Sequence, residues 1–319
     1  MTNQNNNLQS IDSKNKRHSD VHIDLYKILS VLWAQKSLIL ISTFMAFITA
    51  MFVSLSIPNT YRSEALLAPV SSDTDGLGGL ASQFGGLASL AGVSLPGGSD
   101  DKITMGLEVL KSRKFFANLI EKYDVLVPLM AAEAWDAENN QLLIDSKVYD
   151  KEAGLWLRDV KAPRKKEPSV QEAYDVFLQK MKIQEDKETG FIRLSIEHYS
   201  PYIAKNWVDM LIFEINETVR EQDLSQAERS IAYLHEQIKS TPLAELQAGF
   251  FELIQSQTET IMLAKASPEY IFKTVDPAIV PELKAKPQRA LICVLGVLLG
   301  GMFGVFIVLV RNFMFPKNN

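Results

Sequence analysis

Two long stretches without any charged residue divide the hydrophobic pattern of the chain. The first covers residues 37–61 and the second residues 290–310, and Lys or Arg borders each of them. An α-helix rises about 1.5 Å per residue, so each stretch is long enough to cross the roughly 30 Å hydrocarbon core of a bilayer. Buried helices of a soluble core are the alternative, but such helices rarely lack charges over this length. We therefore predict one transmembrane helix at residues 37–61 and another at residues 289–311.

The chain between these helices, residues 62–288, is predicted to form one domain on one side of the membrane. It holds 25 Lys and Arg against 35 Asp and Glu, a net charge of −10, whereas the rest of the chain sums to +5. Cytoplasmic flanks of membrane helices are enriched in Lys and Arg. We therefore expect both terminal segments, residues 1–36 and 312–319, in the cytoplasm. Three cations next to the second helix run against this trend: Lys284, Lys286 and Arg289.

The beginning of the domain combines a strand pattern with a glycine-rich segment. Residues 61–70 alternate in a way that predicts a β-strand. Residues 76–98 contain eight of the 16 glycines, together with several leucines and Phe84. Glycine loses much backbone entropy on folding, so a regular helix or strand is not expected there. Two interpretations stay open: a mobile surface loop, and a loop that orders against a neighbouring subunit.

The middle of the domain predicts short helices and a hairpin. Apolar spacing indicates one helix over residues 104–124. Ser169 is the expected N-cap of another helix that ends near Lys180. Residues 183–185 and 191–198 predict a β-hairpin. The second strand is expected to be half-buried, because apolar and polar residues alternate along it.

Residues 126–168 are expected to be irregular. Turn signals stand at Asn139-Asn140 and Ala153-Gly154, and three aromatic residues of the region are candidate anchors: Trp135, Tyr149 and Trp156. A basic cluster follows in the same region: Lys161, Arg164, Lys165 and Lys166. Two interpretations of this cluster stay open, a solvated loop and a contact for anionic sugar or phosphate groups.

Residues 201–266 predict two long helices. The first extends from Pro201 to Ser240, about 60 Å at about 1.5 Å per residue. Thr241 is the expected N-cap of the second helix, with Pro242 at its first position. Each helix carries an apolar stripe at near-heptad spacing: Leu224, Ala227, Ile231, Leu234 and Ile238 in the first, and Leu243, Leu246, Phe250, Leu253 and Ile261 in the second. We therefore expect an antiparallel helical hairpin that extends away from the membrane.

The fold class predicted for the chain is α+β, with two transmembrane helices flanking the domain. Residues 62–200 and 267–288 are expected to form its base, from which the helices of residues 201–266 extend. An extended segment at residues 272–280 returns to the base. Three prolines stand between the start of this segment and the second membrane helix: Pro277, Pro281 and Pro287. Because proline disrupts a helix interior, no helix is expected there.

Candidate chemistry is sparse. The only cysteine, Cys293, lies in an apolar stretch, and the four histidines are far apart without metal-ligand spacing. Asp73 and Asp75 imitate a D-x-D motif, but no further carboxylate follows at the spacing of a calcium loop. The chain has neither a P-loop nor a G-x-S-x-G motif. Its net charge of −5 argues against nucleic acid as a partner. We expect no enzymatic activity, no metal and no cofactor.

The second membrane helix carries a face of small residues. Gly296, Gly300 and Gly304 recur every four residues, and Gly301 lies beside them. In a bilayer, small residues let two helix backbones approach closely. The sequence leaves three possibilities open: glycines that face lipid, contact with the first membrane helix, and contact across subunits.

The order of these features resembles the polysaccharide co-polymerases, the Wzz-type determinants of O-antigen chain length. The resemblance extends over nearly the whole chain and is most specific before the second membrane helix. There the fixed points are Asp276-Pro277-Ala278, Pro281 and Pro287. Similarity is also found in residues 61–65, residues 191–196 with Ser200-Pro201 and Ala204, Asn216 with Arg220, and residues 228–237.

This resemblance implies a homo-oligomer in the bacterial inner membrane. Each subunit would have both termini in the cytoplasm, a membrane-proximal α/β base and long helices in the periplasm. The implied role is not catalytic: such proteins set the length of the polysaccharide that a Wzy-type polymerase makes. Relatives for capsule or exopolysaccharide that fuse a kinase are disfavoured, because this chain has no P-loop. A membrane-tethered periplasmic glycan enzyme and a transport adaptor are the rival classes.

Overall fold

The chain folds into two compact units, described by a computed structural model. The structure describes residues 25–70, 99–240 and 242–314. One unit combines residues 1–55 with 289–319, and the other comprises residues 56–288. The glycine-rich stretch at residues 76–98 lies outside the described residues, so both interpretations of it stay predictions.

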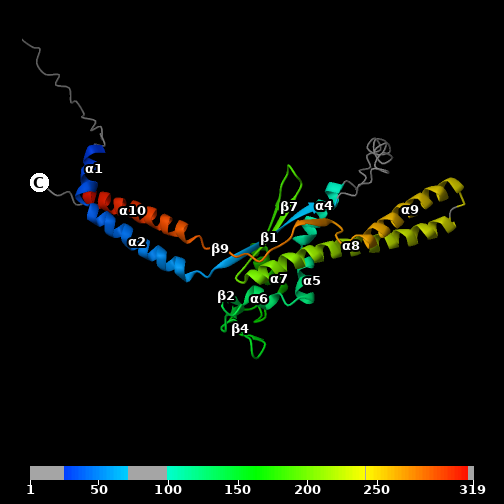
Figure 1. Cartoon of the computed structure of the whole chain (residues 1–319), viewed down its shortest axis with the longest axis horizontal. Helices are drawn as coiled ribbons and strands as arrows, with labels where there is room; N and C mark the ends of the chain where they lie inside the picture. The colour runs from blue at the N-terminus through cyan, green and yellow to red at the C-terminus, as the bar shows by residue number, and fades with distance from the viewer. Residues whose placement is uncertain (1–24, 71–98, 241, 315–319) are drawn as a thin grey trace, which may run out of the picture. The chain divides into compact units, whose positions relative to one another are not determined.

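The described part of the first unit consists of three helices. They are α1 (Leu25–Ala34), α2 (Lys36–Ser56) and α10 (Arg289–Met314) (Figure 1). Both α2 and α10 are long and apolar enough to cross a membrane. Residues 57–61 of the first charge-free stretch lie outside the helix, because Pro58 favours extended backbone before it and lacks an N–H. Helix α1 adds helical structure to the segment expected only as a tail.

An antiparallel sheet forms the centre of the second unit. Its strand order is β6 (Met181–Glu185), β7 (Ile192–His198), β1 (Thr60–Pro69) and β8 (Phe272–Asp276), and β9 (Lys284–Lys286) also pairs with β1. Strand β8 pairs with the C-terminal part of β1, whereas β9 pairs with its first two residues. The first and last strands of the domain therefore lie next to one another.

The predicted hairpin is confirmed as β6–β7, but its second strand is more buried than expected. Ile192, Leu194 and Ile196 are at most 1% exposed, as predicted for the core face. On the opposite face Ser195 and Glu197 are only 6% and 7% exposed. The prediction of a half-buried strand is therefore wrong for its C-terminal part, because neighbouring cations cover Glu197.

Helices supply the rest of the core. They are α4 (Ser99–Leu110), α5 (Arg113–Lys122), α6 (Leu126–Met130), α7 (Val170–Lys180) and the first half of α8 (Pro201–Ser240). The single helix predicted over residues 104–124 is wrong. The chain starts a new helix after Ser112, whose Oγ accepts a hydrogen bond from the Phe115 N–H at 3.1 Å. The predicted Ser169 N-cap of α7 is confirmed by a hydrogen bond from the Glu172 N–H.

The region expected to be irregular contains two small hairpins. They pair β2 (Ala132–Asp136) with β3 (Gln141–Ile144), and β4 (Tyr149–Asp150) with β5 (Leu155–Trp156). The turn signals were correct, since Asn140 and Gly154 both have a positive φ. The strands between the turns were missed, because segments of two to five residues carry little periodicity.

The long helices form the predicted hairpin of α8 and α9 (Ala244–Ala266) (Figure 1). Ala227 and Leu234 of the predicted α8 stripe are buried. The predicted α9 stripe is wrong at Leu246 and Leu253, which are 50% and 52% exposed. The more protected positions of α9 include Gln247, Phe250, Ile254, Gln257, Ile261 and Ala264.

The start of α9 explains this shift of its stripe. Gln247 turns toward α8, where its Nε2 donates to the carbonyl of Ile238 at 3.3 Å. The helix begins at Ala244 with Leu243 as its N-cap and no capping side chain. The predicted Thr241 cap is therefore wrong, and Thr241 itself lies outside the described residues.

Candidate functional site

The proline-rich segment, residues 272–288, is held to β1 along its length. Strand β8 at its start and strand β9 at its end both pair with β1. Between them the Ser63 Oγ donates to the Ile279 carbonyl at 2.7 Å. Asp276 and Pro277 are exposed, Pro281 is half-buried and Pro287 is buried. The structure thus places Asp276 opposite Leu66 of β1, Pro277 and Pro281 between β8 and β9, and Pro287 directly after β9.

Asn216 of α8 holds the residues that lead into this segment. Its side chain is 4% exposed, and its Oδ1 accepts hydrogen bonds from the N–H groups of Tyr270, Ile271 and Phe272 at 2.8–3.0 Å. Its Nδ2 donates to the carbonyls of Ile212 and Phe272, both at 3.0 Å. In the sequence Asn216 was only a point of family similarity. The signal that could have found its role is a lone amide within the apolar part of the helix.

Glu197 of β7 binds cations from three other strands. The Arg62 guanidinium of β1 contacts its Oε1, the Lys182 Nζ of β6 lies 3.4 Å from Oε1, and the Lys286 Nζ of β9 lies 2.6 Å from Oε2. Burial alone would raise the pKa of this carboxyl, but hydrogen bonds from Lys286 and Arg62 lower the pKa to about 2. Glu197 is therefore ionised at any ordinary pH. It links the end of the proline-rich segment to the sheet.

His198 is a structural residue rather than a candidate base. It is fully buried, its Nδ1 accepts from the Ser200 N–H at 3.0 Å, and its Nε2 donates to the Pro128 carbonyl at 3.0 Å. Burial, more than any other effect, lowers the pKa of His198 to about 4, so the ring is neutral near pH 7. A neutral imidazole with both nitrogens engaged by backbone has no free position for acid–base chemistry.

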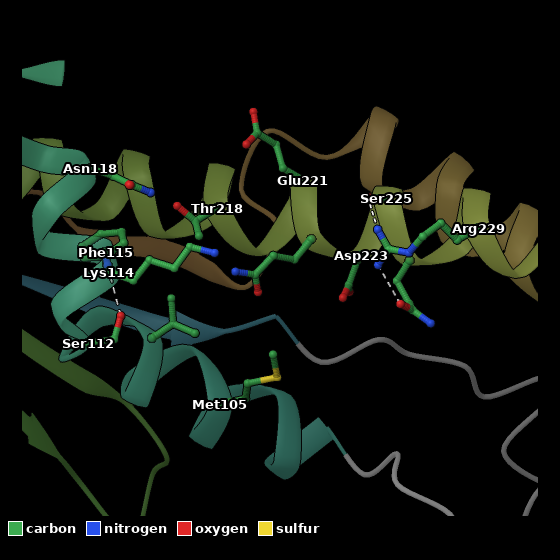
Figure 2. Close-up of a pocket in the computed structure, with 13 residues that line it drawn as sticks. Met105, Ser112, Lys114, Phe115, Asn118, Thr218, Glu221, Asp223, Ser225 and Arg229 are labelled. Atoms are coloured by element: carbon green, nitrogen blue, oxygen red, sulfur yellow. Dashed lines mark hydrogen bonds between the residues drawn. The ribbon is translucent and has the colours of Figure 1, made fainter. Parts of the chain in front are cut away.

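An open hollow of about 820 Å³ lies between α4, α5 and the middle of α8 (Figure 2). Met105, Val109 and Phe115 contribute apolar surface to it, and the remaining lining is mostly polar. Several of these polar groups are paired with neighbours: Arg229 donates to Ser225 and Gln226, and Asp223 accepts from Lys102 and Tyr270. An open hollow that mixes apolar side chains with partly paired polar groups favours contact with another molecular surface over catalysis.

The glycine face of α10 lies against α2 of the same chain. A Cβ placed on Gly300 would lie 3.1 Å from the Thr43 Cα, and one on Gly296 would lie 2.5 Å from the Ala50 Cβ. At Gly304 the nearest backbone atom of α2 would be 3.1 Å away. Gly301 is different, because its nearest neighbour would be a side-chain atom at 3.6 Å. Of the three possibilities that the sequence left open, this geometry favours contact with the first membrane helix.

The other sequence candidates do not form a site in the described part of the chain. Lys161, Arg164, Lys165 and Lys166 are all exposed. Arg164 pairs with Glu172 at 3.0 Å. Asp73 and Asp75 lie outside the described residues. Over the described ranges, no three His, Cys, Asp or Glu side chains lie close enough together to hold a metal ion.

Two sequence families match parts of the chain. Residues 21–123 match the chain length determinant protein family (Wzz), and residues 247–313 match the G-rich domain on putative tyrosine kinase (GNVR). No curated protein sequence matches the chain. Among solved structures, a full-length bacterial polysaccharide co-polymerase is similar at 15% identity, with 92% of this chain and 99% of that chain covered. Its TM-score of 0.39 is too low to support an argument.

The family match covers a specific part of the fold. Residues 21–123 include the first membrane helix, the central strand β1 and the helices α4 and α5 of the base. The resemblance noted in the sequence included residues 61–65 of the same region, so two observations agree there. Over residues 21–123 the chain is therefore similar to the chain length determinant protein family.

Proposed function

We propose that the protein regulates the chain length of lipopolysaccharide O-antigen, as a non-catalytic partner of a Wzy-type polymerase. The match of residues 21–123 to the chain length determinant family carries this proposal. The two candidate membrane helices at either end of the domain support it. In this role the protein forms a homo-oligomer that contacts the polymerase and the growing polysaccharide.

The proposed location is the bacterial inner membrane, with the domain of residues 62–288 in the periplasm. The support is the charge distribution, with a net −10 in the domain and +5 in the rest of the chain. Fusions of alkaline phosphatase and green fluorescent protein after residue 240 test this orientation. Active phosphatase and a dark fluorescent protein are expected. The opposite pattern would place the domain in the cytoplasm and contradict the proposal.

A role without catalysis fits the described titratable groups. Glu197 and His198 are among the most buried of them, and both are engaged by structural partners. The hollow beside α8 is open and several of its polar groups are paired. Recognition of a polymerase or a polysaccharide surface needs only an exposed face of mixed polar and apolar groups such as this one.

A capsule or exopolysaccharide co-polymerase is the second candidate. The match of residues 247–313 to the G-rich domain on putative tyrosine kinase favours it. This match covers most of α9, the proline-rich segment and nearly all of α10, and the O-antigen proposal shares only α10 with it. The two candidates therefore differ in which polysaccharide the protein regulates, the O-antigen or a capsule or exopolysaccharide.

Deletion of the gene, followed by gel analysis of lipopolysaccharide and of secreted polysaccharide, tests these candidates. The O-antigen role predicts that polymer is still made but loses its preferred length, and that the full chain expressed in trans restores it. A change only in capsule or exopolysaccharide would support the second candidate. Loss of all polymer would support the rival of a periplasmic glycan enzyme and contradict both.

A further inference from the structure

Two cations of the second unit are tied closely to the membrane helices by the chain itself. Arg62 of β1 lies six residues after α2 ends at Ser56, and Lys286 of β9 lies three residues before α10 begins at Arg289. An extended residue spans at most about 3.6 Å, so these cations stay within about 22 Å and about 11 Å of the helix ends. Both are therefore close to the bilayer surface in any arrangement of the two units.

The sheet brings further cations to the same place. Arg62, Lys182 and Lys286 all contact the Glu197 carboxylate. Lys180 is the last residue of α7, and its Nζ lies over the Tyr199 ring, 5.0 Å from the ring centroid. Its charge interacts with those of Glu197 and Lys286, and it has no ion-pair partner among the described residues. Four cations around one carboxylate leave a formal charge of +3. The adjacent Arg193–Glu64 pair, at 2.8 Å, adds no net charge.

This cluster is both ordered and accessible. The Glu197 side chain is 8% exposed, whereas those of Arg62, Lys182 and Lys286 are 37%, 45% and 55% exposed. The buried carboxylate thus orients three cations whose remaining N–H groups can donate to a further anion. A phosphate with several acceptor oxygens matches such a group of donors.

The surroundings fit a membrane surface. The cluster is cationic although the domain carries a net −10. Leu283, next to Lys284 at the start of β9, is 85% exposed. The ring of Tyr61, the residue before Arg62 in β1, packs edge-on against Trp135 at 5.4 Å. Cations, an exposed apolar side chain and aromatic rings together are typical of segments at the headgroup level of a bilayer.

We propose that Arg62, Lys180, Lys182 and Lys286 bind the phosphate of an anionic membrane lipid headgroup. The bound headgroup balances the charge that Glu197 leaves uncompensated and holds the base of the domain on the membrane. The cluster also gives a role to Lys286, one of the three cations next to the second membrane helix that run against the usual charge trend. The proposal rests on the two membrane helices and is independent of the O-antigen role.

The test uses the purified full chain in non-ionic detergent. Its thermal midpoint is followed during titration with short-chain phosphatidylglycerol, short-chain phosphatidylcholine or sodium phosphate. A ligand that binds only the folded state raises the midpoint with its concentration. Phosphatidylglycerol is expected to raise it, and phosphatidylcholine to do so much less. An equal effect of free phosphate at equal concentration would show an anion site without lipid preference and overturn the lipid assignment.

Substitutions then locate the effect. Lys182→Gln with Lys286→Gln is expected to raise the half-saturating phosphatidylglycerol concentration by about 30-fold. The control variant, Lys151→Gln with Lys187→Gln, also removes two positive charges, but from exposed turns. It should leave the half-saturating phosphatidylglycerol concentration unchanged. If the first double variant fails to fold, Lys182→Gln alone keeps the Arg62 and Lys286 contacts of Glu197 and should still weaken binding several-fold. Equal responses of parent and cluster variants would overturn the proposal.

Discussion

A single buried amide joins the long helix α8 to the segment that leads into the second membrane helix. Asn216 satisfies three N–H groups and two carbonyls at 2.8–3.0 Å. Buried backbone groups without partners each cost about 1–3 kcal/mol. The amide therefore has an effect on stability well beyond its size.

Asn216→Ala is expected to lower the thermal midpoint of the full chain by about 5–10 °C, because it leaves buried N–H groups of residues 270–272 without an acceptor. Circular dichroism in detergent measures this midpoint. Asn206→Ala is the matched control, since Asn206 is exposed on the same helix. Equal midpoints for both variants would show that the amide is not needed to hold this segment.

His198 makes the stability of the fold depend on pH. Burial lowers its pKa to about 4, below the value of about 6.5 in the unfolded chain. The unfolded state therefore binds more protons between these values, and stability falls as the pH falls through this window. The contribution of neutral His198 to the free energy of unfolding is fully present above about pH 6.5. At pH 4.5 this free energy is lower by about 2–3 kcal/mol.

The thermal midpoint of the parent protein is expected to fall by about 5–10 °C between pH 7 and pH 4.5. In the His198→Gln variant the midpoint should depend much less on pH over this range. The control is His235→Gln, because His235 is exposed on α8. The thermal midpoint of this control variant should depend on pH as strongly as that of the parent protein. A parental slope in the His198 variant would assign the pH dependence to other groups.

At the level of elements, the glycine face of α10 determines how the two membrane helices pack. The neighbours of Gly300 on α2 include backbone atoms, which lie 3.1 and 3.3 Å from the position that a Cβ would occupy, and backbone cannot rotate away. Gly301 lies one position around the helix, and a Cβ there would have no neighbour closer than 3.6 Å. The two positions form a natural pair for comparison.

Gly300→Leu is expected to separate α2 from α10, lower the thermal midpoint and shift the polymer toward short or random lengths, with the protein still inserted. Gly301→Leu should change each of these much less. The combined replacement of Gly296, Gly300 and Gly304 by Leu should exceed the single change. Gel analysis of the polymer in a complemented deletion strain measures the lengths. Parental lengths and midpoint for the triple variant would exclude a packing role for this face.

The proline-rich segment is the second element with a proposed functional role. Proline fixes φ near about −65°, so Pro277 and Pro281 limit the bending of the chain between β8 and β9. Pro281→Ala is expected to broaden the length distribution without unfolding the domain. Pro242→Ala, at the exposed tip of the helical hairpin, is the control and should keep the parental distribution. Unfolding of the Pro281 variant would instead make the segment a requirement of the fold.

At the scale of the whole molecule, the two halves of α8 are suited to different tasks. Near the base, Trp207 and Ile212 are buried, but Phe213 remains 57% exposed. Farther along, Glu228 and Glu236 belong to an exposed polar face. An exposed aromatic side chain near the base favours contact between subunits there rather than along the outer half.

Phe213→Glu is therefore expected to reduce the oligomer size measured by light scattering in detergent. Glu228→Lys with Glu236→Lys reverses two charges on the outer half and should leave assembly intact. If α8 faces the polymer, the distribution of polysaccharide chain lengths is expected to change in this variant. Dissociation of the charge-reversed variant to monomers would contradict this division.

The elements with strong local signals were predictable from the sequence. Charge-free stretches of more than 20 residues indicated both membrane helices. The bounds of α8 followed from Pro201 and from the break after Ser240, and the Ser169 cap and the β6–β7 hairpin followed from local hydrogen bonding and alternation. These features depend on hydrophobicity, capping and backbone restriction, which act within a few residues.

Only the tertiary structure determined which surfaces meet. It brought Lys286 and Arg62, 224 residues apart, to one carboxylate, and it turned the glycine face of α10 toward α2. It also moved the buried stripe of α9 from Leu246 to Gln247, because an apolar helix offers several faces and the contact with α8 selects one. Strand register and helix rotation depend on partners distant in sequence, so local pattern alone leaves them undetermined.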